Sequence, residues 1–240
     1  MFKKILIISA VYDEVKPIVK HLGKSKSIKK HSMIVEKGKI NNRNTDILVS
    51  GPGILNAVHS LTLYLENNPK PDLIIQTGCA GAFLQKNISI GDLGIASKEI
   101  YHHLGVENPK NPIIPSPLPF SLTNENFLTN VFETDKNTSL QVLDIIKTKT
   151  QYKVGFYPFL TVSEITSTRK KAEFLFKNYD AGMENMEGAG SAYVSFLYKI
   201  PFIEIRAASN ETGDRNKLNW DFDKAFKNSC DCVLNVLKYA

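Results

Sequence analysis

The sequence has few cysteines, a single tryptophan and no long hydrophobic run. Its three cysteines, an odd number, are Cys79, Cys230 and Cys232, which excludes a disulfide framework and favours reduced thiols. Cys230 and Cys232 are two residues apart in a predicted helix, so they cannot bind one metal ion together, and we expect them in the core. The apolar run at residues 5–10 is too short for a secretory signal or for a membrane span of about 20 residues. We therefore expect a soluble, cytoplasmic protein with no membrane contact and no metal site.

The composition is that of an ordinary globular protein. Of the 240 residues, 42% are hydrophobic and 22% are charged, which excludes a disordered chain, a collagen-like repeat and a coiled coil. The net charge is +6, with a pI near 9.0, and lysines cluster at 24–30 and basic residues at 169–171. No nucleic-acid-binding motif accompanies these clusters, so we expect no nucleic-acid partner.

Short apolar runs alternate with helical patterns along the whole sequence. Residues 4–10 and 72–77 are apolar without alternation, as in strands that are buried on both faces. Further strands are predicted at 31–37, 45–50, 93–97, 152–165 and 202–206, and helices at 13–22, from 54, from 168, at 189–200 and at 221–238. We predict that residues 1–240 form a single α/β domain, a central mixed and twisted sheet flanked by helices.

Residues 102–120 interrupt this rhythm. Five of the 11 prolines stand here, at positions 109, 112, 115, 117 and 119, which is too many for a helix or a central strand. A long irregular loop in a compact domain is usually functional or mobile. We hypothesise that His102 and His103, at its start, lie beside the end of the site that receives a ligand's 5′ substituent.

Polar or small residues stand at the ends of several predicted strands. Glu14 follows the first strand, residues 78–81 (Gly-Cys-Ala-Gly) follow another, Glu187 begins a helix, and Asn210 follows the strand at 202–206. Each has a simple structural explanation, such as the helix dipole for Glu187 or a turn for Asn210. Ligands of open α/β sheets bind at the carboxyl ends of strands, so four such positions favour a site for a polar ligand.

The same segments resemble the nucleoside phosphorylase and nucleosidase superfamily. The resemblance is carried, in chain order, by residues 9–15 (SAVYDEV), 51–56 (GPGILN), 77–81 (TGCAG), 184–189 (ENMEGA) and 206–210 (RAASN). Within the superfamily the chain is most similar to the futalosine hydrolases of an alternative menaquinone pathway, through residues 184–188 and 206–210 and through 214–216 (DRN) and 219–220 (NW).

The resemblance implies a cofactor-free enzyme that breaks a purine–ribose bond through a transition state with positive charge on the sugar. Glu14 matches the glutamate that activates water, where an anion serves both as base and as countercharge. Glu187 matches the carboxylate that binds the ribose 2′ and 3′ hydroxyls, and Met186 the residue that packs against the sugar. The related phosphorylases hold phosphate with glycine and arginine near the first strand, and residues 8–20 contain neither. Water is therefore the expected nucleophile.

The expected base-binding residues show one informative departure. Ala80 and Gly81 match backbone contacts to the base, and Cys79 and Ser209 stand beside them in the motifs. Asn210 replaces the aspartate of adenine-specific nucleosidases. An asparagine can accept from a protonated N7 while donating to a 6-oxo group, which suits hypoxanthine or guanine. Ile165 stands where the related nucleosidases have an aromatic ring stacked on the base, so the stacking residue stays open.

These inferences favour hydrolysis of futalosine to hypoxanthine and dehypoxanthine futalosine. Three alternatives stay open. A methylthioadenosine/adenosylhomocysteine nucleosidase fits the two glutamates but not Asn210, a 6-oxopurine nucleoside phosphorylase fits Asn210 but not Glu14, and a purine nucleoside could also be bound without catalysis. The resemblance also implies a homo-oligomer, a dimer or larger. We expect the apolar stripe of Ile54, Val58, Leu61 and Leu65 and the loop at 102–120 to face the partner subunit.

Overall fold

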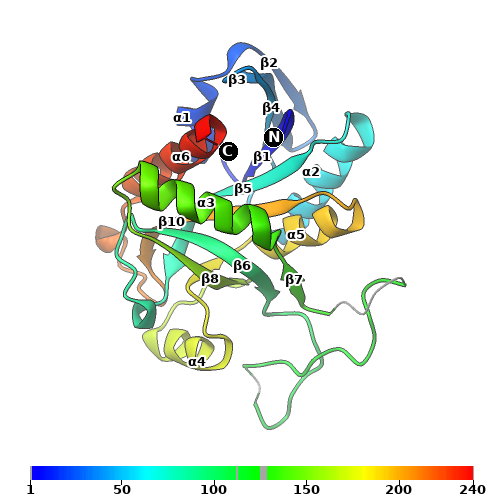
Figure 1. The fold of residues 1–240 in the computed structure, drawn as a ribbon. Coiled ribbons are helices and arrows are strands. Elements are labelled where there is room, and N and C mark those ends of the chain that lie inside the picture. The colour runs from blue at the N-terminus through cyan, green and yellow to red at the C-terminus, as the bar shows by residue number, and fades with distance from the viewer. Residues whose placement is uncertain (1, 112, 125–128, 240) are drawn as a thin grey trace.

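The computed structural model describes residues 2–111, 113–124 and 129–239, and Figure 1 shows a mixed sheet with helices packed on it. The strands are β1 (Lys4–Ser9), β2 (Gly23–Lys30), β3 (Met33–Ile40), β4 (Arg43–Val49), β5 (Leu73–Ala82), β6 (Leu93–Tyr101), β7 (Val131–Glu133), β8 (Val154–Thr161), β9 (Met183–Asn185) and β10 (Phe202–Glu211). The α-helices are α1 (Tyr12–Val19), α2 (Ile54–Asn67), α3 (Lys136–Lys149), α4 (Arg169–Tyr179), α5 (Gly188–Leu197) and α6 (Phe222–Tyr239). The predicted α/β fold class is confirmed.

The strand order is β10-β6-β8-β9-β5-β1-β4-β3-β2, with β7 paired to β6. Because β5 also pairs with β10, the strands β10, β6, β8, β9 and β5 close into a ring. The pairs β1–β4, β1–β5 and β5–β10 are parallel, so the carboxyl ends of these strands meet at one edge. The short strand β9 lies antiparallel to the end of β5 at that edge.

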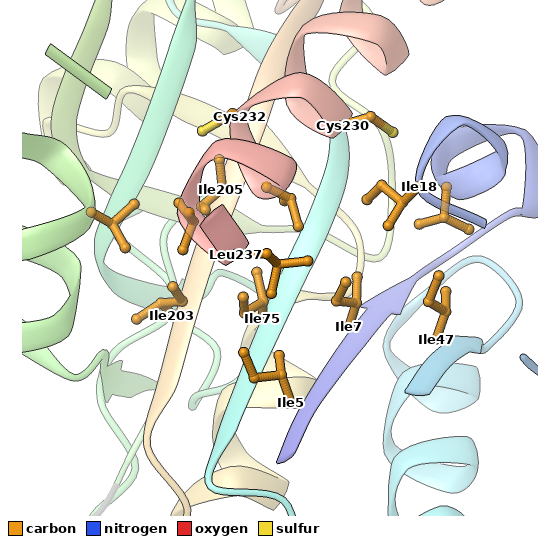
Figure 2. Packing of buried hydrophobic residues seen from close by; sticks show 14 of the residues in the cluster. Ile5, Ile7, Ile18, Ile47, Ile75, Ile203, Ile205, Cys230, Cys232 and Leu237 are labelled. Carbon is orange, nitrogen blue, oxygen red and sulfur yellow. The ribbon is translucent and has the colours of Figure 1, made fainter. Parts of the chain in front are cut away.

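Strand β1 is buried on both faces, which explains its continuous apolar run. Side chains alternate between the faces of a sheet. Ile5 and Ile7 pack into a cluster with α1, α3 and α6, whereas Leu6 and Ile8 pack into a second cluster with α2 and α5. Figure 2 shows the first cluster continuing across the sheet to Ile75 of β5.

Three strands escaped the sequence analysis. β2 is polar and mostly exposed (GKSKSIKK), because it lies at the edge of the sheet and covers little of the core. β7 and β9 are only three residues long, too short for a hydrophobic period to register. β5 and β10 also extend beyond their predicted ends, through residues 78–82 and 207–211, because the two strands continue to pair with each other there.

The apolar stripe of α2 does not face a partner subunit, which corrects our expectation. Leu61 and Leu65 are buried, and Ile54 and Val58 pack into the same cluster with α5. The stripe therefore completes the core of the chain. Cys230 and Cys232 are both fully buried on α6, and no disulfide forms among the described cysteines.

The segment at 102–120 is irregular, as predicted. Its described residues form no helix or strand, apart from one isolated bridge between Val106 and Ser116. Pro112 lies outside the described residues. Among the helices that the structure describes, none combines the length and apolar character needed to cross a bilayer.

Candidate active site

A cavity of about 390 Å³ opens where β1, β5 and β10 end and β9 crosses. All the predicted site residues line it, namely Glu14, Cys79, Ala80, Gly81, Ile165, Met186, Glu187, Ser209 and Asn210. A larger hollow of about 830 Å³ lies beside residues 122–124 and 133–135 and the end of α5, and none of the predicted site residues lines it. The fold therefore gathers side chains from five separate segments into one chamber.

Glu14 occupies the first turn of α1, and its carboxylate is almost fully enclosed. Oε2 accepts hydrogen bonds from Ser9 Oγ (2.8 Å) and from the backbone N–H groups of Ala10 (3.1 Å) and Val11 (3.2 Å). Oε1 accepts from the Cys79 N–H at 3.0 Å. Four donors thus fix this carboxylate at the cavity wall, where it can take a proton from a bound water.

Gly78 makes room for Glu14. A Cβ on this glycine would lie 2.5 Å from Glu14 Oε1, closer than real contacts allow. Position 78, inside β5, therefore requires glycine.

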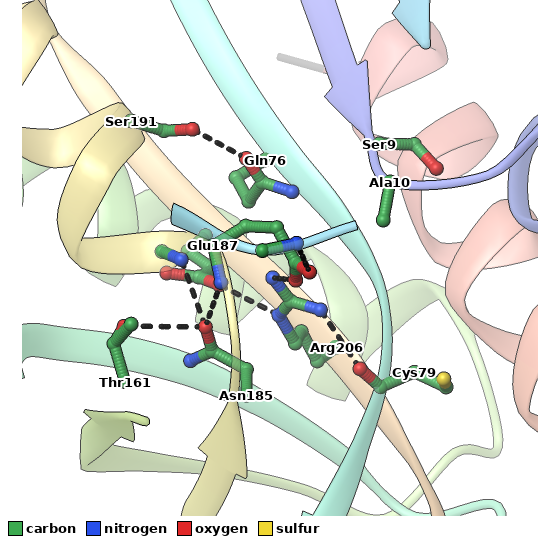
Figure 3. Close-up of polar contacts among 12 residues, drawn as sticks. Ser9, Ala10, Gln76, Cys79, Thr161, Asn185, Glu187, Ser191 and Arg206 are labelled. Atoms are coloured by element: carbon green, nitrogen blue, oxygen red, sulfur yellow. Dashed lines mark hydrogen bonds and ion pairs between the residues drawn. The ribbon is translucent and has the colours of Figure 1, made fainter. Parts of the chain in front are cut away.

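Glu187 precedes α5 and is held at both carboxylate oxygens (Figure 3). Oε1 accepts from the Gly53 N–H at 2.8 Å, and Oε2 pairs with Arg206 Nη2 at 3.1 Å. Burial raises the pKa of Glu187, whereas the charge of Arg206 acts to lower it. A carboxylate held in this way can accept further hydrogen bonds from a diol.

Arg206 is the buried link among the strands of the site. Its Nε donates to Glu204 at 2.6 Å, its Nη1 to the Cys79 carbonyl at 2.8 Å, and its Nη2 to Glu187. It is only 2% exposed, so removing either carboxylate would leave a buried charge poorly compensated. From the sequence, Arg206 was recognised only as part of a motif and without a role of its own.

Asn185 organises the start of α5 (Figure 3). Its Oδ1 accepts from the backbone N–H groups of Glu187 (3.0 Å) and Gly188 (2.8 Å), and its Nδ2 donates to Glu99 at 2.6 Å. Burial and the neighbouring Glu204 raise the pKa of Glu99 well above its usual range. This buried polar network fixes the backbone that carries Glu187.

Ser209 and Asn210, near the end of β10, line one wall of the cavity. Ser209 Oγ donates to Asn210 Oδ1 at 2.8 Å, and Asn210 Nδ2 donates to the Glu211 carbonyl at 2.9 Å. An amide has two N–H groups and two acceptor sites. One N–H and one acceptor site of Asn210 thus stay available to a ligand.

Cys79 contributes its backbone to the site. Its N–H binds Glu14 and its carbonyl binds Arg206, so the peptide groups on both sides of this residue are engaged. Burial raises the pKa of the Cys79 thiol, so the thiol is neutral at pH 7. The Ala80 carbonyl oxygen lies 3.3 Å from Ser209 Oγ, as the longer of two acceptors near that hydroxyl.

The aromatic wall of the cavity was not predicted. Trp220, Phe222 and Phe226 line it, and Trp220 and Phe222 meet edge to face with ring centroids 5.5 Å apart. The Arg215 guanidinium stacks over Trp220 at 4.8 Å. The pair Asn219-Trp220 had been noted as a motif, but only the folded chain brings its indole to the site. Ile165, the residue at the expected stacking position, is 45% exposed at the rim.

The two histidines of the 102–120 loop do not line the cavity, so the hypothesis that they face a ligand is wrong. His102 is buried, with its Nδ1 3.0 Å from the Tyr179 hydroxyl, and its ring packs against His103. His102 thus joins the loop to the end of α4. Among the described residues, no group of three or more metal-ligating side chains comes together.

Comparison with known proteins places this geometry in a family. A family model described as the phosphorylase superfamily matches residues 4–238. The chain therefore belongs to that superfamily, and the predicted resemblance is confirmed. Its relatives are named as nucleosidases, which confirms the predicted enzyme class, an N-glycosyl hydrolase.

Two curated relatives are 5′-methylthioadenosine/S-adenosylhomocysteine nucleosidases. The one from Bacillus licheniformis is 29% identical over 197 residues, 80% of each chain. The one from Maridesulfovibrio salexigens is 29% identical over 249 residues, 98% of this chain and 99% of that protein.

Solved structures of both enzyme types share the fold. Futalosine hydrolase of Helicobacter pylori aligns with a TM-score of 0.85 at 19% identity, covering 99% of this chain and 98% of that one. The Neisseria meningitidis methylthioadenosine/adenosylhomocysteine nucleosidase, in complex with methylthio-immucillin-A, also gives 0.85 at 19%, covering 99% and 100%. The equal scores support the fold and do not distinguish the substrates.

Proposed function

We propose that the protein hydrolyses the N-ribosidic bond of futalosine and releases hypoxanthine. The observation that carries the proposal is Asn210, which lines the cavity with Ala80 and Gly81 and uses only one N–H and one acceptor site in the bonds described above. A 6-oxopurine offers an acceptor at O6, which the second N–H can bind, and a protonated N7, which the amide oxygen can bind. An adenine offers an amino group at position 6, which would meet a donor.

The proposed reaction uses the two fixed glutamates. Water attacks C1′ while the C1′–N9 bond breaks. The electron pair of the C1′–N9 bond leaves with the base. Glu14 takes the proton from the water and opposes the positive charge on the sugar. Glu187 accepts from the ribose 2′ and 3′ hydroxyls, and Arg206 and Gly53 hold its orientation. The departing base takes up a proton from solvent at nitrogen and is released as neutral hypoxanthine, and Glu14 returns its proton to solvent.

The second candidate is methylthioadenosine/adenosylhomocysteine nucleosidase. It is favoured by the names of the curated relatives and by the aromatic wall of Trp220, Phe222 and Phe226, which suits an apolar 5′ substituent. Glu14 and Glu187 can serve either reaction. The choice between the two substrates therefore depends on whether the site binds a 6-oxopurine or a 6-aminopurine.

A chromatographic assay with futalosine, inosine and methylthioadenosine, each with and without phosphate, tests the proposal. We expect hypoxanthine release from futalosine at a rate independent of phosphate. Faster release of adenine from methylthioadenosine would establish the second candidate, phosphate dependence would indicate a phosphorylase, and no release from any substrate would indicate a binding protein.

A further inference from the structure

Glu184 is a buried carboxylate in the cavity wall to which the reaction above gives no role. It lies on β9, is 6% exposed, and lines the same chamber as Asn210. A carboxylate is costly to bury unless donors satisfy it, so its position in a ligand site requires an explanation.

The strand pairing fixes where Glu184 stands relative to Asn210. Gly81 of β5 has Glu184 of β9 as its neighbour on one side and Asn210 of β10 as its neighbour on the other. Two strand spacings separate the two residues by about 10 Å. Gly81 has no side chain, and the position of its missing Cβ lies 2.8 Å from Thr212 Oγ1 and 3.5 Å from Asn210 Nδ2. At this position β5 therefore places no side chain between the amide of Asn210 and the carboxylate of Glu184.

Both donors that hold Glu184 come from one residue. The Thr166 N–H donates to Oε1 at 3.0 Å, and the Thr166 hydroxyl donates to Oε2. Each carboxylate oxygen has two acceptor sites, so each retains one. Burial raises the pKa of Glu184, whereas the nearby charges of Lys171 and Arg215 act to lower it.

We infer that Glu184 accepts a hydrogen bond from N1–H of the base and makes the site selective for 6-oxopurines, an inference that rests on the proposed function. Along the edge of a 6-oxopurine the groups follow the order N7, O6, N1–H. Asn210 binds the N7 and O6 end, and Glu184, across Gly81, binds the N1 end. Adenine has an unprotonated N1, whose lone pair would face the carboxylate. Glu184 therefore adds a second, independent discrimination against adenine.

Binding of free bases tests this inference apart from the 5′ group of the substrate. We would measure the Kd of hypoxanthine, 1-methylhypoxanthine and adenine by titration calorimetry at pH 8, for the wild type and for Glu184→Gln. The wild type is expected to bind hypoxanthine most tightly. Losing a charged hydrogen bond weakens binding by about 10- to 100-fold. Glu184→Gln is therefore expected to raise the Kd of hypoxanthine by that factor and to leave the Kd values of 1-methylhypoxanthine and adenine nearly unchanged. The difference in affinity between hypoxanthine and the other two bases should become smaller.

Thr166→Val is the matched control, because it removes one anchor of Glu184 and keeps the carboxylate. It is expected to keep the preference for hypoxanthine over 1-methylhypoxanthine and adenine, because the carboxylate that accepts N1–H is still present. If Glu184→Gln weakens all three equally, Glu184 only anchors Thr166 and the inference is overturned. If the Gln variant does not fold, the wild type still decides: equal affinity for hypoxanthine and 1-methylhypoxanthine, preference for adenine, or no binding of hypoxanthine overturns it. Failure to cleave futalosine would instead overturn the proposed function and leave these base affinities interpretable.

Discussion

Glu14 and Cys79 are 65 residues apart in the chain, and the Cys79 N–H donates to Glu14 Oε1 at 3.0 Å. This bond joins the first turn of α1 to β5, the strand whose end also contacts Arg206 through the Cys79 carbonyl. A single peptide segment thus fixes the distance between Glu14 and the Arg206–Glu187 pair. The proposed water-activating group and the proposed sugar-binding group are therefore parts of one rigid arrangement.

Glu14→Gln is expected to lower kcat by about 10²- to 10⁴-fold, the usual effect of losing a general base. The glutamine keeps the size and most acceptor contacts but cannot take the proton. The measurement is kcat across pH 5–9 on the best substrate of the assay above. Ser9→Ala is the control, because it removes one donor to Glu14 and keeps the carboxylate. Near-native turnover with an unchanged pH profile in the Gln variant would contradict the assignment.

Glu187→Gln is expected to reduce kcat/KM strongly for a ribonucleoside and much less for its 2′-deoxy analogue. The reason is that the deoxy substrate lacks one of the hydroxyls that the carboxylate binds. If Glu187 had only a structural role, its replacement would lower stability, chiefly by leaving the buried charge of Arg206 with one carboxylate fewer, and would leave activity intact. Thermal unfolding separates the two roles: full activity with a lower Tm would show a purely structural residue.

Asn210→Asp is expected to lower cleavage of the 6-oxo nucleoside and to raise any activity on its 6-amino analogue. An aspartate places an anion against O6, and a site built for one hydrogen-bonding group can reject an analogue lacking it by about 10⁴-fold. The measurement is the ratio of kcat/KM for futalosine and its 6-amino form in both proteins, which cancels the 5′ contacts. An unchanged ratio would mean that Asn210 only ends its strand.

Acidification is expected to destabilise the protein through His102. Burial lowers the pKa of His102 from its ordinary value of 6.5 to about 4. Between these two values the unfolded chain binds a proton that the folded chain does not, so the free energy of unfolding falls as the pH drops through this window. Above pH 6.5, His102 does not change the free energy of unfolding.

The contribution of one such group is at most about 1.4 kcal/mol per pH unit. Urea unfolding at pH 7.5, 6.0 and 5.0 measures it, and His102→Gln is expected to show a smaller loss of stability between these values. An equal pH dependence in the two proteins would show that other groups determine it.

A homo-oligomer is still expected, through a different surface from the stripe of α2. Leu55, on the outer side of α2, is 83% exposed, and Phe196 and Leu197 on the adjacent α5 are 41% and 46% exposed. Light scattering at micromolar concentration is expected to give at least twice the chain mass of 26.9 kDa. Leu55→Glu is expected to lower the measured mass towards that of the monomer. Leu218, which is 92% exposed and lies outside α2 and α5, serves as the control, and Leu218→Glu is expected to leave the mass unchanged. A fully active wild-type monomer would contradict the expectation.

Local pattern was sufficient for the elements that lie in the middle of the fold. The run at residues 4–10 predicted β1 because both of its faces are buried, and the helical spacing from residue 189 predicted α5. The motifs also named several of the residues that line the cavity, because each stands next to the end of such an element. β2 and β9 have no comparable hydrophobic pattern. An edge strand such as β2 buries few apolar side chains, and a strand of three residues such as β9 is too short to show an alternation of apolar and polar residues.

The sequence by itself determined the α/β class, the superfamily and the set of candidate site residues, since these depend on hydrophobic period and on short contiguous motifs. Only the tertiary structure decided which of these residues meet, and what else meets them. The pairing of β5 with both β9 and β10 sets Glu184 and Asn210 on either side of Gly81. Folding also brings Trp220 into the cavity and takes His102 away from it. Such contacts join residues distant in the chain, and they form because strand pairing and burial satisfy backbone and side chains together.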